Sequence, residues 1–323
     1  MKDHFMRSGS RRLAAVCAAV LLMGGCADPA RETASGTFDG PWTIGVQPGD
    51  IHEAYVAKAD LRPVPLPDCA VDSDREDPVL SRDGRAIALT GCWRASDSTY
   101  ETVVIRERTL QEIPSITGAA EWVGTTGRLL GEADDGVLRL VDTARSADPG
   151  RVLTTLDGKI HAIDVNPAGT VALVLYGGRE AGQDGKVTLA DTRITAVSLT
   201  SGHRDTIHTP AGTVDAQWTP DGRHIVAETA NQWITFDSRS ATTTDARPRP
   251  STTMTSEAKS KATMPCRLVA VTNRSTIGWC PATGEIMRFD RHSDSPAATR
   301  LAHVDQQRPL DGSVSVAVDL LLD

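Results

Sequence analysis

The sequence predicts an all-β chain that folds as a β-propeller, with six blades expected and seven as the alternative. A phrase of strand, tight turn and strand recurs along residues 77–290. Its turn glycines, Gly84, Gly127, Gly169 and Gly222, lie 43, 42 and 53 residues apart. No segment after residue 25 shows a sustained helical period. Repeats of about 40 to 50 residues with β signals are typical of propeller blades.

Each copy of the phrase joins a turn former to apolar strands. Two copies read Ser-Arg-Asp-Gly (81–84) and Thr-Pro-Asp-Gly (219–222), a third reads Asn-Pro-Ala-Gly (166–169), and a worn copy occupies 121–130. Proline presets φ, and glycine supplies the positive φ that closes the turn. A fifth unit, without the turn phrase, spans 268–290. Strands of alternating character are expected at 102–106, 137–142, 194–199 and 232–237.

The two ends of the chain are expected to complete a sixth unit. Strand-like segments at 42–46 and 55–57 would pair with a terminal strand at 314–320. Such a closure leaves no blade with an open edge, which is what a propeller requires.

The repeated phrase resembles the TolB-like and WD-like propeller repeats, in which a strand, Ser-Pro-Asp-Gly and a second apolar strand follow one another. The resemblance covers residues 77–290 and is carried by the turns at 81–84 and 219–222. It implies the fold and a role in protein interaction, but no partner-binding residue can be carried over.

The first thirty residues indicate a cleaved export signal. Three arginines (Arg7, Arg11 and Arg12) precede a short apolar run at 13–23, about half the length that a membrane span needs. The run ends in Gly-Gly-Cys at 24–26, which resembles a lipobox, with Met23 where the family usually has leucine. The resemblance implies a diacylglycerol on Cys26 and cleavage before it. The protein is then expected at the extracytoplasmic face of the cell membrane, exported by the general or the twin-arginine route.

The chain accordingly divides into a signal peptide (1–25), a lipidated tether (26–40) and a propeller domain (41–323). Within the domain, residues 238–264 are rich in Ser and Thr and are expected to form an extended loop, either a tolerated insertion or a partner-binding arm.

Charge limits the partners of the mature chain. Residues 26–323 hold 30 basic and 41 acidic residues, a net charge near −11. Nucleic-acid binding needs a basic face and is therefore disfavoured, so no nucleic-acid partner is expected. The membrane is expected to be reached through the lipid on Cys26.

Four cysteines remain besides Cys26, and an even number in an oxidising compartment indicates disulfides. The favoured pairs are those close in sequence, Cys69 with Cys92 and Cys266 with Cys280. A zinc site is the competing interpretation, but the CxxC spacing that zinc ligands prefer is absent from the sequence.

The sequence offers no catalytic motif, and neither a cofactor nor a metal is expected. GxSxG, HExxH, a Walker A loop and GxGxxG are all missing from it. The acidic run at 72–77 lacks the glycine and glutamate of an EF-hand and is interpreted as a solvated loop, with a looser cation site as the alternative. Trp122 and Trp218 are expected to pack between blades, and Trp93 and Trp279 over the disulfides. The weak candidates for a metal or acid–base site are His161, His203, His208 and His224.

The resulting prediction is a lipid-anchored propeller that acts as a protein-interaction or scaffolding module of the cell envelope, with an unidentified envelope protein as partner. The alternatives are a calcium-dependent hydrolase or lactonase and a binding protein for carbohydrate or a small ligand. Acidic side chains that converge at one channel mouth would favour the enzyme. Exposed aromatic residues would favour sugar binding, and a contiguous apolar patch would favour a protein partner.

Overall fold

The computed structural model divides the chain into two compact units, residues 1–33 and 34–323, and every described residue belongs to the second. The described residues are 35–38, 44–47, 53–57, 61–65, 70–71, 79–82, 86–94, 99–106, 109–145, 147–181, 187–210, 212–239, 242–255, 261–291, 298–305 and 313–316. Within them, one short 3-10 helix, η1 (Thr143–Arg145), accompanies the strands. None of the described segments is a helix long and apolar enough to cross a membrane.

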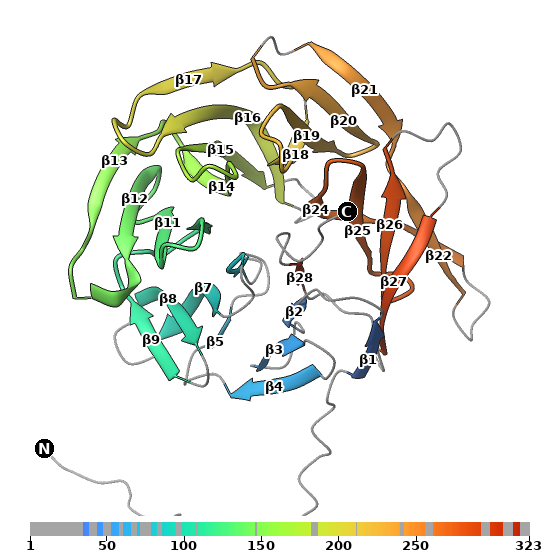
Figure 1. The fold of residues 1–323 in the computed structure, drawn as a ribbon, viewed down its shortest axis with the longest axis horizontal. Helices are drawn as coiled ribbons and strands as arrows, with labels where there is room; N and C mark the ends of the chain where they lie inside the picture. Colours follow the sequence, from blue (N-terminus) through green and yellow to red (C-terminus); the bar gives the residue numbers. More distant parts are fainter. Residues whose placement is uncertain are drawn as a thin grey trace, which may run out of the picture. The chain divides into compact units, whose positions relative to one another are not determined.

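Five antiparallel sheets stand side by side around a common axis as blades I to V (Figure 1). Blade I contains β6 (Val79–Leu80), β7 (Ala86–Arg94), β8 (Thr99–Arg106) and β9 (Thr109–Ile113), with β5 (Ala70–Val71) also paired to β7. Blade II contains β10 (Ala120–Val123), β11 (Arg128–Glu132), β12 (Val137–Asp142) and β13 (Arg151–Thr155). Blade III contains β14 (Lys159–Val165), β15 (Val171–Ala181), β16 (Val187–Ser198) and β17 (Arg204–Ile207). Blade IV contains β18 (Thr213–Trp218), β19 (His224–Thr229), β20 (Gln232–Asp237) and β21 (Thr243–Pro248). Blade V contains β24 (Arg267–Val271), β25 (Ser275–Cys280), β26 (Glu285–Asp290) and β27 (Ala298–Asp305), and β1 (Ser35–Phe38) pairs with the outer edge of β27.

A further sheet, here called the closing sheet, joins the two ends of the propeller unit. Its strand order is β28 (Ser313–Val316), β2 (Ile44–Gln47), β3 (Glu53–Ala57) and β4 (Leu61–Pro65). Ile44 is the register partner of Val316, as the sequence predicts for the two ends of the chain. The innermost strand β28 lies beside β24 of blade V and β6 of blade I.

The expected blade number is corrected. The repeated units form five blades with described side chains, where six or seven were expected. The difference arises at the chain ends, because the strands assigned to a sixth unit lie in the closing sheet, which is described by its backbone alone.

The turns of the repeated phrase adopt the predicted conformation. Gly127, Gly169 and Gly222 have φ of 71°, 66° and 67°, a region that favours glycine. The amide of Gly222 donates to the carbonyl of Thr219 at 2.8 Å, and that of Gly169 to the carbonyl of Asn166 at 2.8 Å. These turns connect the innermost strand of a blade to its second strand, so the phrase sets where each sheet begins.

One apolar cluster joins each pair of neighbouring blades from I to V. Side chains alternate between the two seams of a blade: Leu129 packs toward blade I, and Leu130 toward blade III. Trp122 lies in the seam between blades I and II, where its indole Nε1 donates to the carbonyl of Val79 at 2.9 Å. Trp218 is half-buried in the seam between blades III and IV. The expectation that both tryptophans pack between blades is therefore confirmed.

Residues 238–264 do not form the single long loop that was expected. They contain β21, the outer strand of blade IV, and most of a hairpin of β22 (Ser251–Thr255) and β23 (Lys261–Pro265). Threonine is β-branched and suits a strand, and Pro248 is tolerated because it ends an outer strand. A polar composition alone was thus a poor indicator of a loop.

Candidate functional site

Three carboxylates occupy the innermost strands of three consecutive blades, and we call them the inner carboxylates. Glu121 lies on β10 of blade II, Asp164 on β14 of blade III and Asp215 on β18 of blade IV. They interact electrostatically: Asp164 and Asp215 raise the pKa of Glu121, and Asp164 raises the pKa of Asp215. Acidic side chains from the innermost strands of three blades therefore lie near enough to influence one another's titration.

Burial is the main cause of their perturbed titration. Loss of water raises the pKa of Asp164 to about 7 and that of Asp215 to about 7, and it raises the pKa of Glu121 well above its ordinary value. Backbone hydrogen bonds to all three carboxylates act in the opposite direction but do not cancel the effect. Near neutral pH Asp164 and Asp215 can therefore take up or release a proton.

The inner carboxylates also hold backbone amides. Asp164 Oδ2 accepts a hydrogen bond from the amide of Trp218 at 2.5 Å, which links blade III to blade IV. Asp215 accepts from its neighbour Ala216 at 2.8 Å and from Gln217 Nε2 at 3.1 Å. Each of these bonds stabilises the ionised carboxylate. A structural role in fixing the inner strands thus accompanies any chemical one.

A guanidinium from blade I approaches the same region. Arg82 donates from Nη1 to the carbonyl of Pro167 at 3.0 Å and from Nη2 to that of Val165 at 2.9 Å, both at the end of β14. Its charge lowers the pKa of Glu121 and of Asp164, opposing the effect of burial. Arg82 therefore connects blade I to blade III and offsets part of the negative charge.

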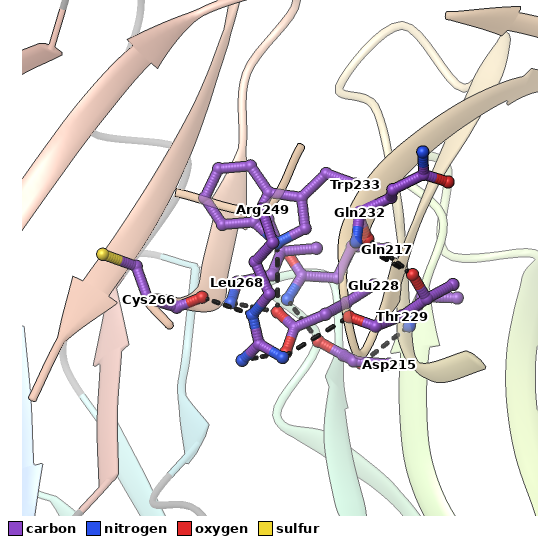
Figure 2. Close-up of polar contacts among 10 residues, drawn as sticks. Asp215, Gln217, Glu228, Thr229, Gln232, Trp233, Arg249, Cys266 and Leu268 are labelled. Atoms are coloured by element: carbon purple, nitrogen blue, oxygen red, sulfur yellow. Dashed lines mark hydrogen bonds and ion pairs between the residues drawn. The ribbon is translucent and has the colours of Figure 1, made fainter. Parts of the chain in front are cut away.

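A second group of polar residues closes the seam between blades IV and V (Figure 2). Glu228 on β19 forms an ion pair of 2.7 Å with Arg249, and the two side chains are only 5% and 10% exposed. The other carboxylate oxygen of Glu228 accepts from the amide of Leu268 on β24 and from Trp233 Nε1 at 3.3 Å. Arg249 Nε donates to the carbonyl of Cys266 at 2.8 Å. Both charges thus bind the backbone of blade V.

Glu132 plays a similar role in the seam between blades II and III. It is buried on β11 of blade II, and its Oε1 accepts from the amides of Gly136 at 3.0 Å and Ile160 at 2.9 Å. Ile160 belongs to β14, the innermost strand of the next blade. In both Glu132 and Glu228, burial raises the pKa, and a second-strand carboxylate fastens the following blade.

The structure places the predicted cysteines in two groups. Cys266 and Cys280 are fully buried and form the expected disulfide, which joins the residue before β24 to the last residue of β25 within blade V. Trp279, predicted to pack over this bond, directly precedes Cys280 in the sequence, and its side chain is buried. Cys26 and Cys69 lie outside the described residues, and for Cys92 only the backbone in β7 is described, so lipidation and the second disulfide stay predictions.

The predicted histidines do not form a site. His161 on β14 lies 3.2 Å from the carbonyl of Gly177, and His203 faces Asp205 at 3.4 Å in an exposed hairpin. His224 is the first residue of β19, where its amide donates to Thr219 Oγ1 at 3.0 Å. Within the described ranges no three His, Cys, Asp or Glu residues are grouped as a metal ion would require. The acidic run 72–77 lies outside the residues that the structure describes.

Sequence reasoning missed the inner carboxylates, although a signal was present. Copies of the repeated phrase place an acid beside apolar residues a few positions before the turn glycine, as at Glu121, Asp164 and Asp215. An acid that recurs in an otherwise buried strand suggests a seam position. Arg249 gave no such signal, because it lies in the segment interpreted as a loop.

Comparison with known proteins supports the fold. No protein-family model matches the sequence, and no curated protein matches it either. TolB from Acinetobacter baumannii is 11% identical with a TM-score of 0.51, over 86% of this chain and 67% of that chain. A chain of a nidogen/laminin complex is 8% identical with a TM-score of 0.57, over 86% of this chain and 98% of that chain. The predicted TolB-like propeller is thereby confirmed as a fold, which does not itself define an activity.

Proposed function

We propose that this chain is a lipoprotein of the cell envelope whose propeller binds a protein partner as an interaction or scaffolding module. The observation that carries the proposal is the ring of blades joined by buried seams, because it presents loops of separate blades on one rigid support. The nidogen/laminin complex provides a similar propeller within an assembly of proteins.

The anchor is proposed from the leader. The short apolar run and Gly-Gly-Cys at 24–26 support acylation of Cys26. Two acyl chains on one cysteine are enough for stable attachment to a membrane. The propeller would then act at the extracytoplasmic face, where a disulfide such as Cys266–Cys280 persists.

We propose that the partner binds at the innermost strands β10, β14 and β18, which carry the inner carboxylates. Val214, at the register shift of β18 between Thr213 and Asp215, is 38% exposed and offers an apolar contact on the same innermost strand as Asp215. A lysine or arginine of a partner would favour the ionised carboxylates and would lower their pKa on binding. The partner segment that fits is therefore cationic with an adjoining apolar side chain.

Site-specific photocrosslinking on intact cells tests this proposal. A photoreactive residue at Val214 is compared with one at Val152, which is 48% exposed on the outer strand β13 of blade II. We expect one envelope protein to be captured through position 214, and less of it when Asp164 and Asp215 are changed to Asn. Capture at neither position, or unchanged capture in the double variant, would contradict the proposed binding surface.

An enzyme is the second candidate, favoured by the pKa of about 7 at both Asp164 and Asp215. Such carboxylates suit acid–base chemistry at neutral pH. Their hydrogen bonds to Trp218, Ala216 and Gln217 give them a structural task, which favours the interaction module. Turnover of ester or lactone substrates that is lost in D164N and D215N, while the fold is kept, would support the enzyme instead.

A further inference from the structure

Two arginines are buried at the seam between blades IV and V, and only one of them has a counter-charge. The side chain of Arg249 is 10% exposed and pairs with Glu228 at 2.7 Å. Arg291, the residue that follows β26, is 9% exposed. No carboxylate of the described residues forms an ion pair with it. Because taking a charge out of water is costly, a buried cation without a partner indicates a role that the fold alone does not supply.

The guanidinium of Arg291 uses only one of its three nitrogens. Nη1 donates to the carbonyl of Thr272, in the turn between β24 and β25, at 2.9 Å. Nε is buried and has no hydrogen-bond partner. Nη2 makes no hydrogen bond either, but it is not buried, so the guanidinium can be reached at this nitrogen. Nε and Nη2 form one edge of the guanidinium, which matches the two oxygens of a carboxylate.

The charged groups around Arg291 do not take the place of a partner. Burial lowers the pKa of Arg291, and Asp221 and Asp245 of blade IV oppose this effect from beyond ion-pair distance. Asp245 is already bound to Arg247 at 2.7 Å. Asp221 is exposed and accepts a hydrogen bond from the hydroxyl of Thr219 at 2.6 Å. Both neighbouring carboxylates are therefore engaged elsewhere.

The turn that holds Nη1 lies at the surface. Its other residues, Asn273 and Arg274, are exposed. The amide of Arg291 donates to the carbonyl of Arg274 at 2.7 Å, so the two arginines are joined by their backbones. Asn273 Oδ1 accepts from the amide of Asp221 at 3.1 Å, which fastens this turn to the turn of blade IV. An anion that binds here is therefore also attracted by a second positive charge, that of Arg274.

We propose that the end of this seam at Arg291, with the exposed turn residues Asn273 and Arg274, binds a carboxylate group. The unused edge of the guanidinium offers two parallel hydrogen bonds to such a group, and a single negative charge is enough to neutralise it. A dianion such as phosphate fits less well, because Asp221 and Asp245 would repel it. The carboxylate can belong to a small organic acid or to an acidic side chain of a polypeptide. This site takes an anion, whereas the inner carboxylates suit a cation, so the inference goes beyond the proposed function.

Side-chain NMR of the purified full chain tests the contact directly. Arginine labelled with nitrogen-15 gives an Nε–H signal for each residue, and the signal missing from Arg291→Lys identifies Arg291. We expect acetate to shift this signal in a saturable way, while chloride at the same ionic strength leaves it unchanged. A signal that does not respond to acetate, or that chloride shifts equally, would overturn the proposal.

Unfolding midpoints give a second readout. Arg291→Met removes an unpaired buried charge, so its midpoint in chloride should fall by less than about half of the fall in Arg249→Met, which breaks an ion pair. The extra stabilisation by acetate over chloride should be lost in Arg291→Met and kept in Arg288→Met, a control at an exposed arginine on β26. A midpoint as low as that of Arg249→Met would show that Asp221 and Asp245 already balance the charge and would refute the site. So would an equal effect of acetate on both variants.

A final comparison separates the two sources of the carboxylate. A short peptide with one glutamate is titrated beside acetate, and its glutamine counterpart is the control. Binding of the glutamate peptide about tenfold tighter than acetate supports a site for an acidic side chain, and equal affinities support a site for a small acid. Equally tight binding of the glutamine peptide would contradict recognition of a carboxylate. None of these measurements involves Asp164 or Asp215, so their outcome is independent of the proposed contact at the inner carboxylates.

Discussion

Removal of Arg249 from the seam between blades IV and V should destabilise the propeller strongly. Arg249→Met keeps much of the volume of the side chain but leaves the carboxylate of Glu228 buried without its counter-charge. The variant also gives up the hydrogen bonds from the guanidinium to the carbonyls of Cys266 and Thr229. We expect the free energy of unfolding at pH 8 to fall by about 3–5 kcal/mol.

The magnitude follows from the geometry of the pair. At the observed 2.7 Å, two unit charges attract by roughly 6 kcal/mol for an effective dielectric constant of about 20. Burial costs each ion several kcal/mol. It raises the pKa of Glu228 and lowers that of Arg249, so desolvation outweighs the attraction for each partner. The intact pair is therefore close to neutral for stability, whereas one unpaired member is costly.

Urea unfolding followed by tryptophan fluorescence measures this loss. The loss should shrink between pH 8 and pH 5, because Glu228 can then take up a proton and become neutral. Arg247→Met is the matched control: Arg247 pairs with Asp245 at the same 2.7 Å, but the two side chains are 30% and 37% exposed. We expect that control to cost at most about 1 kcal/mol.

Two outcomes would refute this reasoning. One is a cost below about 1 kcal/mol for Arg249→Met, and the other is a cost that does not change with pH. The double variant Glu228→Met, Arg249→Met should recover most of the loss, because it removes both buried charges. A double variant as unstable as the single one would show that the lost backbone hydrogen bonds, and not the unpaired charge, cause the effect.

Three further predictions concern stability. Folding raises the pKa of Asp164 and of Asp215 from near 3.8 to about 7, so the folded state binds more protons and should become more stable as pH falls from 8 to 5, by about 1–4 kcal/mol. Thermal melts of the double variant D164N, D215N should show a flatter dependence of stability on pH. Replacing Cys266 and Cys280 together by Ala should cost about 3 kcal/mol in denaturant unfolding, given a sequence separation of 14 residues, and an unchanged midpoint would count against the disulfide. Gly278→Ala should lower the free energy of unfolding by about 1–3 kcal/mol, because the new Cβ would lie 2.9 Å from the Trp233 ring. Gly212→Ala is the control: its φ is positive and open space surrounds it, so urea unfolding of this variant reports backbone strain without a clash.

Much of the fold could be predicted because the turn phrase is local. Gly169 and Gly222 adopt the positive φ that their turns require, and the apolar strands on each side alternate between two seams. The pairing of Ile44 with Val316 followed from the need to close the ring. The outer strand β21 was missed, since strands at a blade edge are polar and their Ser and Thr residues resemble those of a loop.

The candidate site could be predicted only in part, because it depends on contacts between blades. Asp164 and Trp218 are 54 residues apart, and Glu228 and Leu268 are 40 apart, so no local pattern reports their hydrogen bonds. The disulfide Cys266–Cys280 was accessible because its partners are close in sequence. Convergence of the inner carboxylates required the order of the blades as well as the sequence.

Buried charge in this propeller lies mainly between blades. Glu132, Asp164 and Glu228 each accept a hydrogen bond from a backbone amide of the following blade. Their raised pKa follows from burial and needs no catalytic purpose. A carboxylate that fastens one blade to the next is costly to replace, because the amide that it accepts from would then be left buried without a partner. A loss of binding in D164N is therefore evidence for a contact with the partner only when the unfolding midpoint of the variant is unchanged.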